Sequence, residues 1–286
     1  MFELFAEAEA HRRLALLEDT RSQREKRRGG QSAQPIRGTA TRRIKQERTI
    51  MTTLTDKRIL VAGGTGTVGR HLVDAVLAAD GTAVVPSRSA EKLEALVEGR
   101  GEDHDQRLVP LLGDIASERE RTALLERARP LHGAVASLGS FVATPKASVL
   151  ASHPTELTRA LDGYVAAHLA AAQSVIPTLE PQGGGYVTIQ GPLAFEPLFT
   201  TAGLVSVATA AQAMLARVLM KELAESSVRV NQVVIYASLG WGDDDQSPVT
   251  GADIGRYVAY LLSDAGAGVR GQTIHLMSPA QVSTLP

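Results

Sequence analysis

Three glycines lie three residues apart in the segment VAGGTGTVGRHL, directly after a run of apolar residues. They are Gly63, Gly66 and Gly69, and the stretch that follows them has helical spacing. Between a strand and a helix, glycines at this spacing allow a tight turn and let the backbone approach a pyrophosphate. The segment therefore predicts a dinucleotide-binding loop, formed by Gly63, Thr65, Gly66, Thr67, Val68 and Gly69. A turn that only joins strand and helix is the alternative.

The next two strand ends predict which dinucleotide binds. A carboxylate after the second strand accepts a bond from the ribose of NAD, whereas an Arg receives the 2′-phosphate of NADP. This chain has Ser87 and Arg88 there and no carboxylate, so we expect NADP(H) to be preferred over NAD(H). Asp114 and Ile115 follow the third strand, where Asp114 could accept from the adenine amino group. A surface role for Arg88 and a helix-capping role for Asp114 stay open.

Short β-rich runs alternate with helical stretches from residue 57 onward. This alternation predicts a single-domain α/β fold, Rossmann-like, with a doubly wound parallel sheet of about seven strands and helices on both faces. The expected strands are 57–63, 82–88, 107–114, 132–139, 185–191, 228–235 and 272–278. The expected helices are 71–80, 90–99, 118–130, 154–179, 205–224 and 253–264.

Composition limits the other possibilities. The 286 residues include no Cys, which excludes disulfides and thiolate metal sites and fits a reducing, cytoplasmic location. The seven His have no metal-ligand spacing, and no apolar run suggests a membrane span of about 20 residues. Residues 1–50 carry 12 Lys and Arg against 7 Asp and Glu.

We expect residues 1–50 to be a basic, disordered N-terminal extension and residues 51–286 to form the nucleotide-binding domain. Translation from Met51 is an open alternative. A nucleic-acid-binding arm is the less favoured interpretation of the Arg clusters.

Several stretches together resemble the short-chain dehydrogenase/reductase family over most of residues 57–280. They are GGTGTVG, the SR after strand two, GDI after strand three, SVIPTL, GYVTIQG, LARVLMKEL with VRVN, and LLSDAGAGVRGQTIHL. The resemblance implies a nicotinamide cofactor, with Gly139 at its site, and oxidoreductase chemistry on a small carbonyl or hydroxyl substrate. The helices at 154–179 and 205–224 are Ala-rich and apolar, so we expect them to form a homo-oligomer interface, as in similar proteins.

The family's hydride chemistry uses a Tyr proton donor, whose pKa near 10 is lowered by a nearby Lys, together with a Ser and an Asn. Counting back from LARVLMKEL places Val205 at the Tyr position and Thr209 at the Lys position. The Ser position falls on Gly191, or on Pro192 if the loop is one residue longer, and the Asn position on Tyr164. No Tyr in the chain is followed by a Lys four residues later. The sequence predicts that the usual pair is absent.

Other side chains could replace it. Tyr164 and His168 lie four residues apart, hence on one helix face, and are candidate proton donors; simple packing is the alternative. Gln190, Ser137 and Ser140 are expected at strand ends that face the nicotinamide pocket in such folds, where they could hydrogen-bond a substrate; hydrogen bonds within the loops are the alternative. The loop that would cover the substrate contains Tyr236, Trp241 and the run Asp243-Asp244-Asp245.

Three functions follow as hypotheses. The first is an NADP(H)-binding family member without the Tyr–Lys mechanism, either non-catalytic or repurposed to elimination, isomerisation or cyclisation. The second is an NADPH-dependent oxidoreductase with an unusual proton donor. The third is a scaffold or regulatory protein that needs no cofactor. Binding of NADP(H) separates the third hypothesis from the other two.

Overall fold

The computed structural model describes residues 52–100, 106–139, 148–179, 181–237, 239 and 247–286. The predictions made for residues 1–50, Ser140, Trp241 and Asp243-Asp244-Asp245 lie outside these residues. The described residues all belong to one compact unit, Thr49–Pro286.

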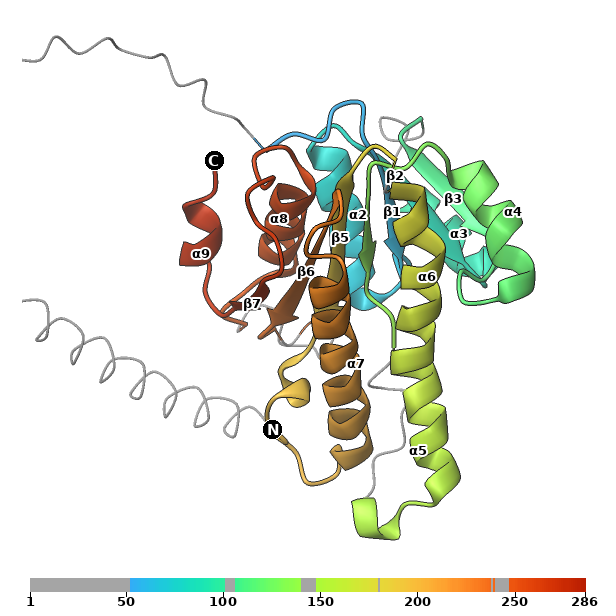
Figure 1. The fold of residues 1–286 in the computed structure, drawn as a ribbon, viewed down its shortest axis with the longest axis vertical. Helices are drawn as coiled ribbons and strands as arrows, with labels where there is room; N and C mark the ends of the chain where they lie inside the picture. The colour runs from blue at the N-terminus through green and yellow to red at the C-terminus, as the bar shows by residue number, and fades with distance from the viewer. Residues whose placement is uncertain (1–51, 101–105, 140–147, 180, 238, 240–246) are drawn as a thin grey trace, which may run out of the picture. The chain divides into compact units, whose positions relative to one another are not determined.

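The centre of the fold is a sheet of seven strands that are parallel throughout, as predicted (Figure 1). The strands are β1 (Arg58–Ala62), β2 (Thr82–Ser87), β3 (Leu108–Leu112), β4 (Gly133–Ala136), β5 (Gly184–Gln190), β6 (Val228–Ile235) and β7 (Thr273–Leu276). Their order is β3-β2-β1-β4-β5-β6-β7, so the winding reverses between β1 and β4. Open parallel sheets bind ligands outside the carboxyl ends of the strands at such a reversal.

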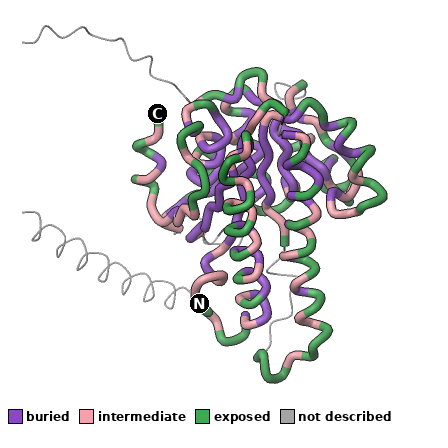
Figure 2. The backbone as a smooth tube through the Cα atoms, in the orientation of Figure 1, coloured by how far each residue is buried: buried purple, intermediate pink, exposed green. Residues whose placement is uncertain are grey.

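Helices cover both faces of the sheet, which confirms the doubly wound prediction. They are α2 (Thr67–Ala78), α3 (Ala90–Glu98), α4 (Glu118–Ala128), α5 (Pro154–Leu161), α6 (Ala167–Leu179), α7 (Gly203–Glu222), α8 (Gly251–Leu262) and α9 (Ala280–Ser283). Short 3₁₀ turns occur at η2 (Val149–Ala151) and η4 (Pro192–Ala194). Figure 2 shows the buried strands between more exposed helices.

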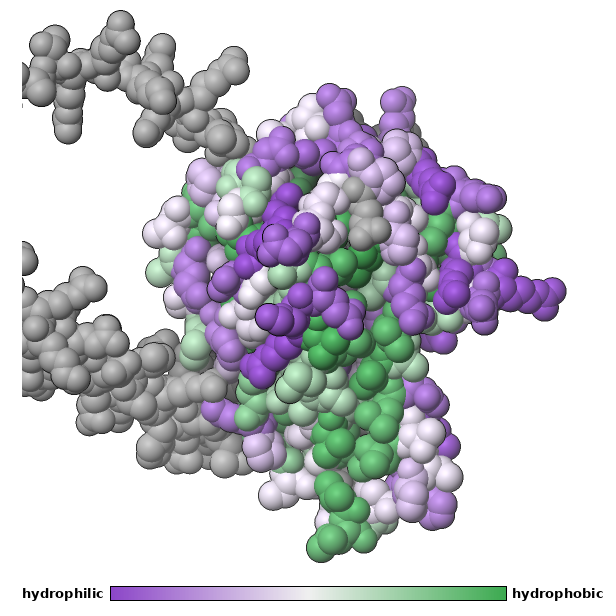
Figure 3. All heavy atoms as spheres, in the orientation of Figure 1, coloured by the Kyte–Doolittle hydropathy of each residue, from purple (hydrophilic) through white to green (hydrophobic). Residues whose placement is uncertain are grey.

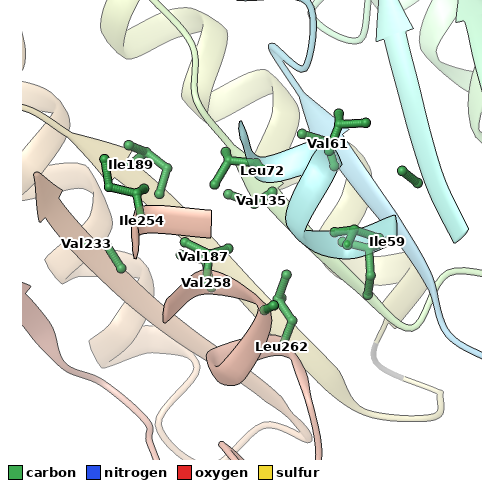
Figure 4. Close-up of a cluster of buried hydrophobic side chains, with 14 of the residues drawn as sticks. Ile59, Val61, Leu72, Val135, Val187, Ile189, Val233, Ile254, Val258 and Leu262 are labelled. Carbon is green, nitrogen blue, oxygen red and sulfur yellow. The ribbon is translucent and has the colours of Figure 1, made fainter. Parts of the chain in front are cut away.

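Alternate strand residues pack into two separate cores, because successive side chains of a strand point to opposite faces. One core joins the sheet to α2, α3 and α8, and the other joins it to α4 and α6. Figure 4 shows part of the first core, with Ile59, Val61, Val135, Val187, Ile189 and Val233 from the strands and Leu72, Ile254, Val258 and Leu262 from α2 and α8.

The expected helix at 154–179 is not regular. A π-helical segment, η3 (Asp162–Ala166), separates α5 from α6 and contains Tyr164. Such π-bulges occur often at functional sites.

Among the described residues, α7 is the one helix long and apolar enough to cross a membrane, with a mean hydropathy of 1.5. Length and composition are weak evidence for a span. Leu204, Val205 and Ala208 of α7 are buried in a cluster with Tyr164. Helices α5 and α7 contact each other and extend together beyond the carboxyl ends of the strands (Figure 1).

Candidate functional site

The glycine loop is too closely packed for a side chain at Gly63 and at Gly69. Gly63 has φ +83°, and a Cβ there would lie 2.0 Å from the carbonyl oxygen of Ser137. A Cβ at Gly69 would lie 2.0 Å from the carbonyl oxygen of Gly63. Gly66 begins α2 with no side-chain cap, so the first N–H groups of the helix are available to an anion. These residues fit the pyrophosphate of a dinucleotide.

A cavity of about 770 Å³ lies beside this loop, within the size range of cofactor sites. Of the predicted cofactor-binding residues, those that line it are Gly63, Thr65, Ser87, Arg88, Asp114, Ile115 and Gly139. The others, Gly66, Thr67, Val68 and Gly69, lie at the start of α2. The cavity therefore brings together the carboxyl ends of β1, β2, β3 and β4.

Polar groups at the ends of β2 and β3 face this cavity. The Ser87 hydroxyl oxygen lies 3.5 Å from that of Thr65 and accepts a hydrogen bond from the Ser89 N–H at 3.3 Å. The side chain of Arg88 is 82% exposed, and its guanidinium lies 3.9 Å from Oδ2 of Asp114. Weak contact with one carboxylate leaves Arg88 able to move toward a ligand.

Asp114 serves the turn before α4 but does not cap the helix. Its Oδ1 accepts the Ala116 N–H at 2.9 Å, whereas the N-cap of α4 is Ser117. Its other oxygen, Oδ2, is left toward Arg88 and the cavity. The adenine-contact prediction for Asp114 is compatible with this position and stays a prediction.

The sequence reasoning missed other residues of the cavity wall. Ser89 and Lys92, in the first turn of α3, line it beside Ser87. Asp162 and Gly163 line it from η3. Lys92 could have been found from its position one helical turn beyond Arg88, but no sequence pattern indicated a π-helix at 162–166.

Tyr164 lies against the edge of this site. Gly139 has φ +99°, and a Cβ there would lie 2.5 Å from the Tyr164 ring. Tyr164 is only 7% exposed and shares a buried cluster with Leu204, Val205 and Ala208. The ring therefore fills the space between the end of β4 and α7.

His168 is buried behind Tyr164. Its Nε2 lies 2.9 Å from the amide nitrogen of Gln212 and 3.3 Å from the carbonyl oxygen of Leu138. The Gln212 amide also donates to the carbonyl oxygen of Ile189, which orients its nitrogen toward the ring. His168 Nε2 then accepts, and Nδ1 carries the proton. Burial lowers the pKa of His168 to about 4, although the Leu138 carbonyl acts in the opposite direction. The imidazole is neutral at pH 7.

The positions named by the resemblance differ in accessibility. Val205 is 1% exposed and Thr209 is 5% exposed. The Thr209 hydroxyl donates to the Val205 carbonyl oxygen at 2.7 Å, within its own helix. Gly191 lies at the open end of β5, where an added Cβ would meet no atom within 4 Å. Of these three positions, only Gly191, which the resemblance assigns to the Ser, therefore faces open space.

Gln190 is buried and bonded within the protein. It lies on the same face of β5 as the core residue Tyr186, and its amide donates to the carbonyl oxygen of Thr209 in α7. The Gln232 amide donates to Gln190, and Thr273 donates to Gln232 at 3.3 Å. This buried chain ties β7, β6 and β5 to α7. Gln190 is therefore placed to hold α7 rather than to contact substrate.

Ser137 and Tyr236 also have structural contacts. The Ser137 N–H donates to the Ala62 carbonyl oxygen, which joins β4 to β1. Tyr236 is 8% exposed, and its hydroxyl lies 3.0 Å from Nδ1 of His275, whose ring meets Phe195 edge-on at 5.0 Å. Tyr236 therefore packs between β6 and β7. Within the described ranges, no three His, Asp or Glu side chains are grouped to hold a metal ion.

Comparisons with known proteins agree with this geometry. A family model described as short chain dehydrogenase matches residues 57–238. Dehydrogenase/reductase SDR family member 4 of Bos taurus is 30% identical over 184 residues, which cover 62% of this chain and 64% of that protein. The chain thus spans less than two thirds of this relative's length.

Two solved structures have similar folds. A 7α-hydroxysteroid dehydrogenase complexed with NADH and 7-oxo glycochenodeoxycholic acid has a TM-score of 0.68 at 22% identity, covering 79% of this chain and 94% of that one. An NADPH-bound short chain oxidoreductase from Pseudomonas aeruginosa PAO1, containing an atypical catalytic center, has a TM-score of 0.67 at 20% identity, covering 78% and 96%. At these identities the likeness establishes the fold.

Proposed function

The chain belongs to the short-chain dehydrogenase family, and on that premise we propose that it binds NADP(H) without using the family's Tyr–Lys mechanism. The observation that carries this proposal is the burial of Val205 and Thr209. Neither side chain has an ionisable group, and the Thr209 hydroxyl is bonded within α7. A pair that cannot release a proton supports either a non-catalytic protein or a repurposed pocket.

The preference for NADP(H) is part of the proposal. It is supported by the end of β2, where Ser87 and Arg88 line the cavity and no carboxylate follows the strand. When bound, the nicotinamide ring of the cofactor supplies or accepts hydride. The residues of this chain would position the cofactor: the glycine loop would hold the pyrophosphate, and Ile115 and Gly139 line the cavity wall.

An alternative is an NADPH-dependent oxidoreductase with an atypical proton donor. It is favoured by Tyr164, whose ring touches Gly139, a residue of the cavity wall. His168 is the weaker candidate, since a buried imidazole with a pKa of about 4 has no cationic form to donate a proton at pH 7. The Pseudomonas aeruginosa structure with an atypical catalytic center supports such variation within the fold.

We also propose that the chain forms a homo-oligomer through α5, α6 and α7. Large apolar side chains are exposed on these helices: Leu169 at 38%, Val207 at 47%, Met214 at 55% and Val218 at 43%. Val207, Met214 and Val218 recur at helical spacing, so they share one face of α7. Figure 3 shows hydrophobic residues gathered over this part of the molecule. A second copy would cover this surface.

Calorimetric titration of the whole chain with NADPH and NADH tests the cofactor proposal. We expect NADPH to bind more tightly than NADH. A panel of carbonyl compounds, followed by the absorbance of the reduced nicotinamide, then tests the mechanism, and we expect no turnover. Turnover that disappears in Tyr164→Phe would favour the oxidoreductase alternative. Absence of binding by either nucleotide would overturn the proposal and favour a scaffold.

A further inference from the structure

We propose that this chain holds the adenosine phosphate half of NADP(H) and gives the nicotinamide half little contact, so that the class of ligand it selects is an adenine nucleotide. The inference rests on the proposed function, because it takes the 770 Å³ cavity as the cofactor site. It deepens that function, since a nicotinamide that the protein does not hold favours the non-catalytic form of the proposal.

The cavity lies on one half of the sheet. A doubly wound sheet has two mononucleotide-binding halves, and a dinucleotide lies across the crevice between them, with the adenosine ribose at the end of β2. Here the reversal of strand order between β1 and β4 separates the two halves. The cavity wall comes from the carboxyl ends of β1, β2 and β3, the start of α3, Leu138 and Gly139 after β4, η3, and the first residue of α6. Of the residues that the structure describes in β5, β6, η4 and α7, none belongs to this wall. The cavity therefore matches the adenosine half.

Apolar side chains fill the space beyond the other half. Tyr164 is buried in a cluster with apolar residues of α7, and Leu193 of η4 packs against that cluster. A Cβ at Gly139 would lie 2.5 Å from the Tyr164 ring. Gly139 is also the last residue after β4 that lines the cavity. The wall therefore stops at Gly139, with the Tyr164 ring packed directly against it.

Polar side chains in this second half are bonded to other protein groups. The Gln190 amide donates to the Thr209 carbonyl oxygen, and the Gln212 amide donates to the Ile189 carbonyl oxygen at 3.2 Å. The Thr209 hydroxyl donates within its own helix. A nicotinamide carboxamide needs partners that replace its bonds to water, and these groups are already engaged. The cavity wall, by contrast, includes four charged side chains: Arg88, Lys92, Asp114 and Asp162.

The test compares three ligands by calorimetric titration of the whole chain. They are NADPH, 2′-phospho-ADP-ribose, which has the same phosphates and riboses without the nicotinamide, and reduced nicotinamide mononucleotide. The difference in affinity between the first two measures what the nicotinamide contributes. Saturation transfer NMR with NADPH then shows which protons of the ligand lie against the protein.

We expect NADPH and 2′-phospho-ADP-ribose to bind within about threefold of each other, and reduced nicotinamide mononucleotide to show no binding at about 1 mM. The adenine protons of NADPH should receive strong saturation and the nicotinamide protons should receive much less.

The variant Tyr164→Ala tests the part that the ring plays. It removes the group packed against Gly139, and NADPH should then bind at least about threefold more tightly than 2′-phospho-ADP-ribose, because the opened space can take the nicotinamide. Leu204→Ala is the matched control, since Leu204 belongs to the same buried cluster, and it should leave the two affinities within about threefold. Circular dichroism confirms that each variant is folded.

One result would overturn the inference and leave the proposed function in place: the unaltered chain binds NADPH about tenfold or more tightly than 2′-phospho-ADP-ribose, with strong saturation of the nicotinamide protons. Equal affinities in Tyr164→Ala would overturn the part assigned to the ring. If the unaltered chain binds none of the three ligands, the proposed function fails and the inference fails with it.

Discussion

The amide nitrogen of Gln212 lies 2.9 Å from Nε2 of His168, and this contact joins α7 to α6 in the interior of the protein. The ring nitrogen accepts and so must be unprotonated, in agreement with a pKa lowered by burial to about 4. Protonation of His168 Nε2 would place a positive charge among buried groups. It would also turn the new N–H toward the N–H of the Gln212 amide. The contact therefore links the charge of one side chain to the packing of two helices.

This link predicts a loss of stability in acid. The pKa of His168 is about 4 when folded and about 6.5 when unfolded, so the stabilisation is complete above pH 6.5 and is lost as the pH falls toward 4. The full effect is roughly 3 kcal/mol, of which about 2 kcal/mol is lost between pH 7.5 and 5. Urea unfolding at both pH values, in the unaltered chain and in His168→Gln, measures it.

The His168→Gln variant separates this residue from other titrating groups. His132 acts in the same direction, because burial and the charges of Lys57 and Arg58 lower its pKa. The His168→Gln variant should keep the pH dependence that comes from His132. It should lose the part that comes from His168, about 2 kcal/mol of unfolding free energy between pH 7.5 and 5. An unchanged pH dependence would mean that His168 is not buried and neutral.

The glycine loop gives a second prediction. Gly63→Ala should abolish nucleotide binding and destabilise the fold, because its Cβ would lie 2.0 Å from the Ser137 carbonyl oxygen at φ +83°. The backbone conformation alone costs a residue with a side chain about 1–3 kcal/mol. Gly268→Ala is the control, since its Cβ would meet nothing within 4 Å. Titration with NADPH and thermal unfolding are the measurements, and normal binding by Gly63→Ala would contradict the loop assignment.

The parallel sheet and the glycine loop were predictable because each depends on local pattern. Apolar runs of strand length, separated by helical spacing, leave few topologies for a parallel sheet. At Gly63 and Gly69 the neighbouring backbone comes within 2.0 Å of where a Cβ would lie, so the requirement for glycine appears in the residue type alone.

The rest of the site depends on the directions in which side chains point, and these directions are not evident from the sequence. Gln190 was expected to contact substrate or to bond within the protein, and the structure shows it buried, with its amide donating to the Thr209 carbonyl oxygen of α7. The segment η3 was missed because a π-helix has no composition of its own, and with it the contribution of Asp162 and Gly163 to the cavity wall was missed. Lys92 was overlooked because exposed lysines are common on helices.

The two positions that the family resemblance assigns to the Ser and the Tyr should differ in how well they tolerate substitution. Gly191→Ser should leave stability within about 0.5 kcal/mol of the original, because the added atoms meet open space. Val205→Tyr should destabilise by about 1–3 kcal/mol, because Val205 is 1% exposed and packed in the cluster of Tyr164. Urea unfolding of the two variants compares them. Equal stability would show that the Tyr position is open, against the proposed function.

The buried glutamines give a prediction about the fold. Gln232→Leu removes the donor to Gln190, leaving its amide oxygen without that partner, and should cost about 1–3 kcal/mol. The double variant Gln190→Leu with Gln232→Leu should be less unstable than the sum of the single variants, since the oxygen is then gone. Additive losses in urea unfolding would mean that the two amides do not depend on each other.

The apolar face of α7 gives the last prediction. Val207→Glu or Met214→Glu should convert an oligomer to smaller species, because each places a charge where a second copy would bury an apolar surface. Leu112→Glu is the matched control, since Leu112 is 55% exposed at the end of β3, a different element. Light scattering after size exclusion gives the mass of each. A monomeric mass for the unaltered chain would refute the proposed assembly. Dissociation by all three variants would mean that the effect does not assign the interface to α7. Dissociation by the two α7 variants alone would assign the interface to the exposed apolar face of this helix.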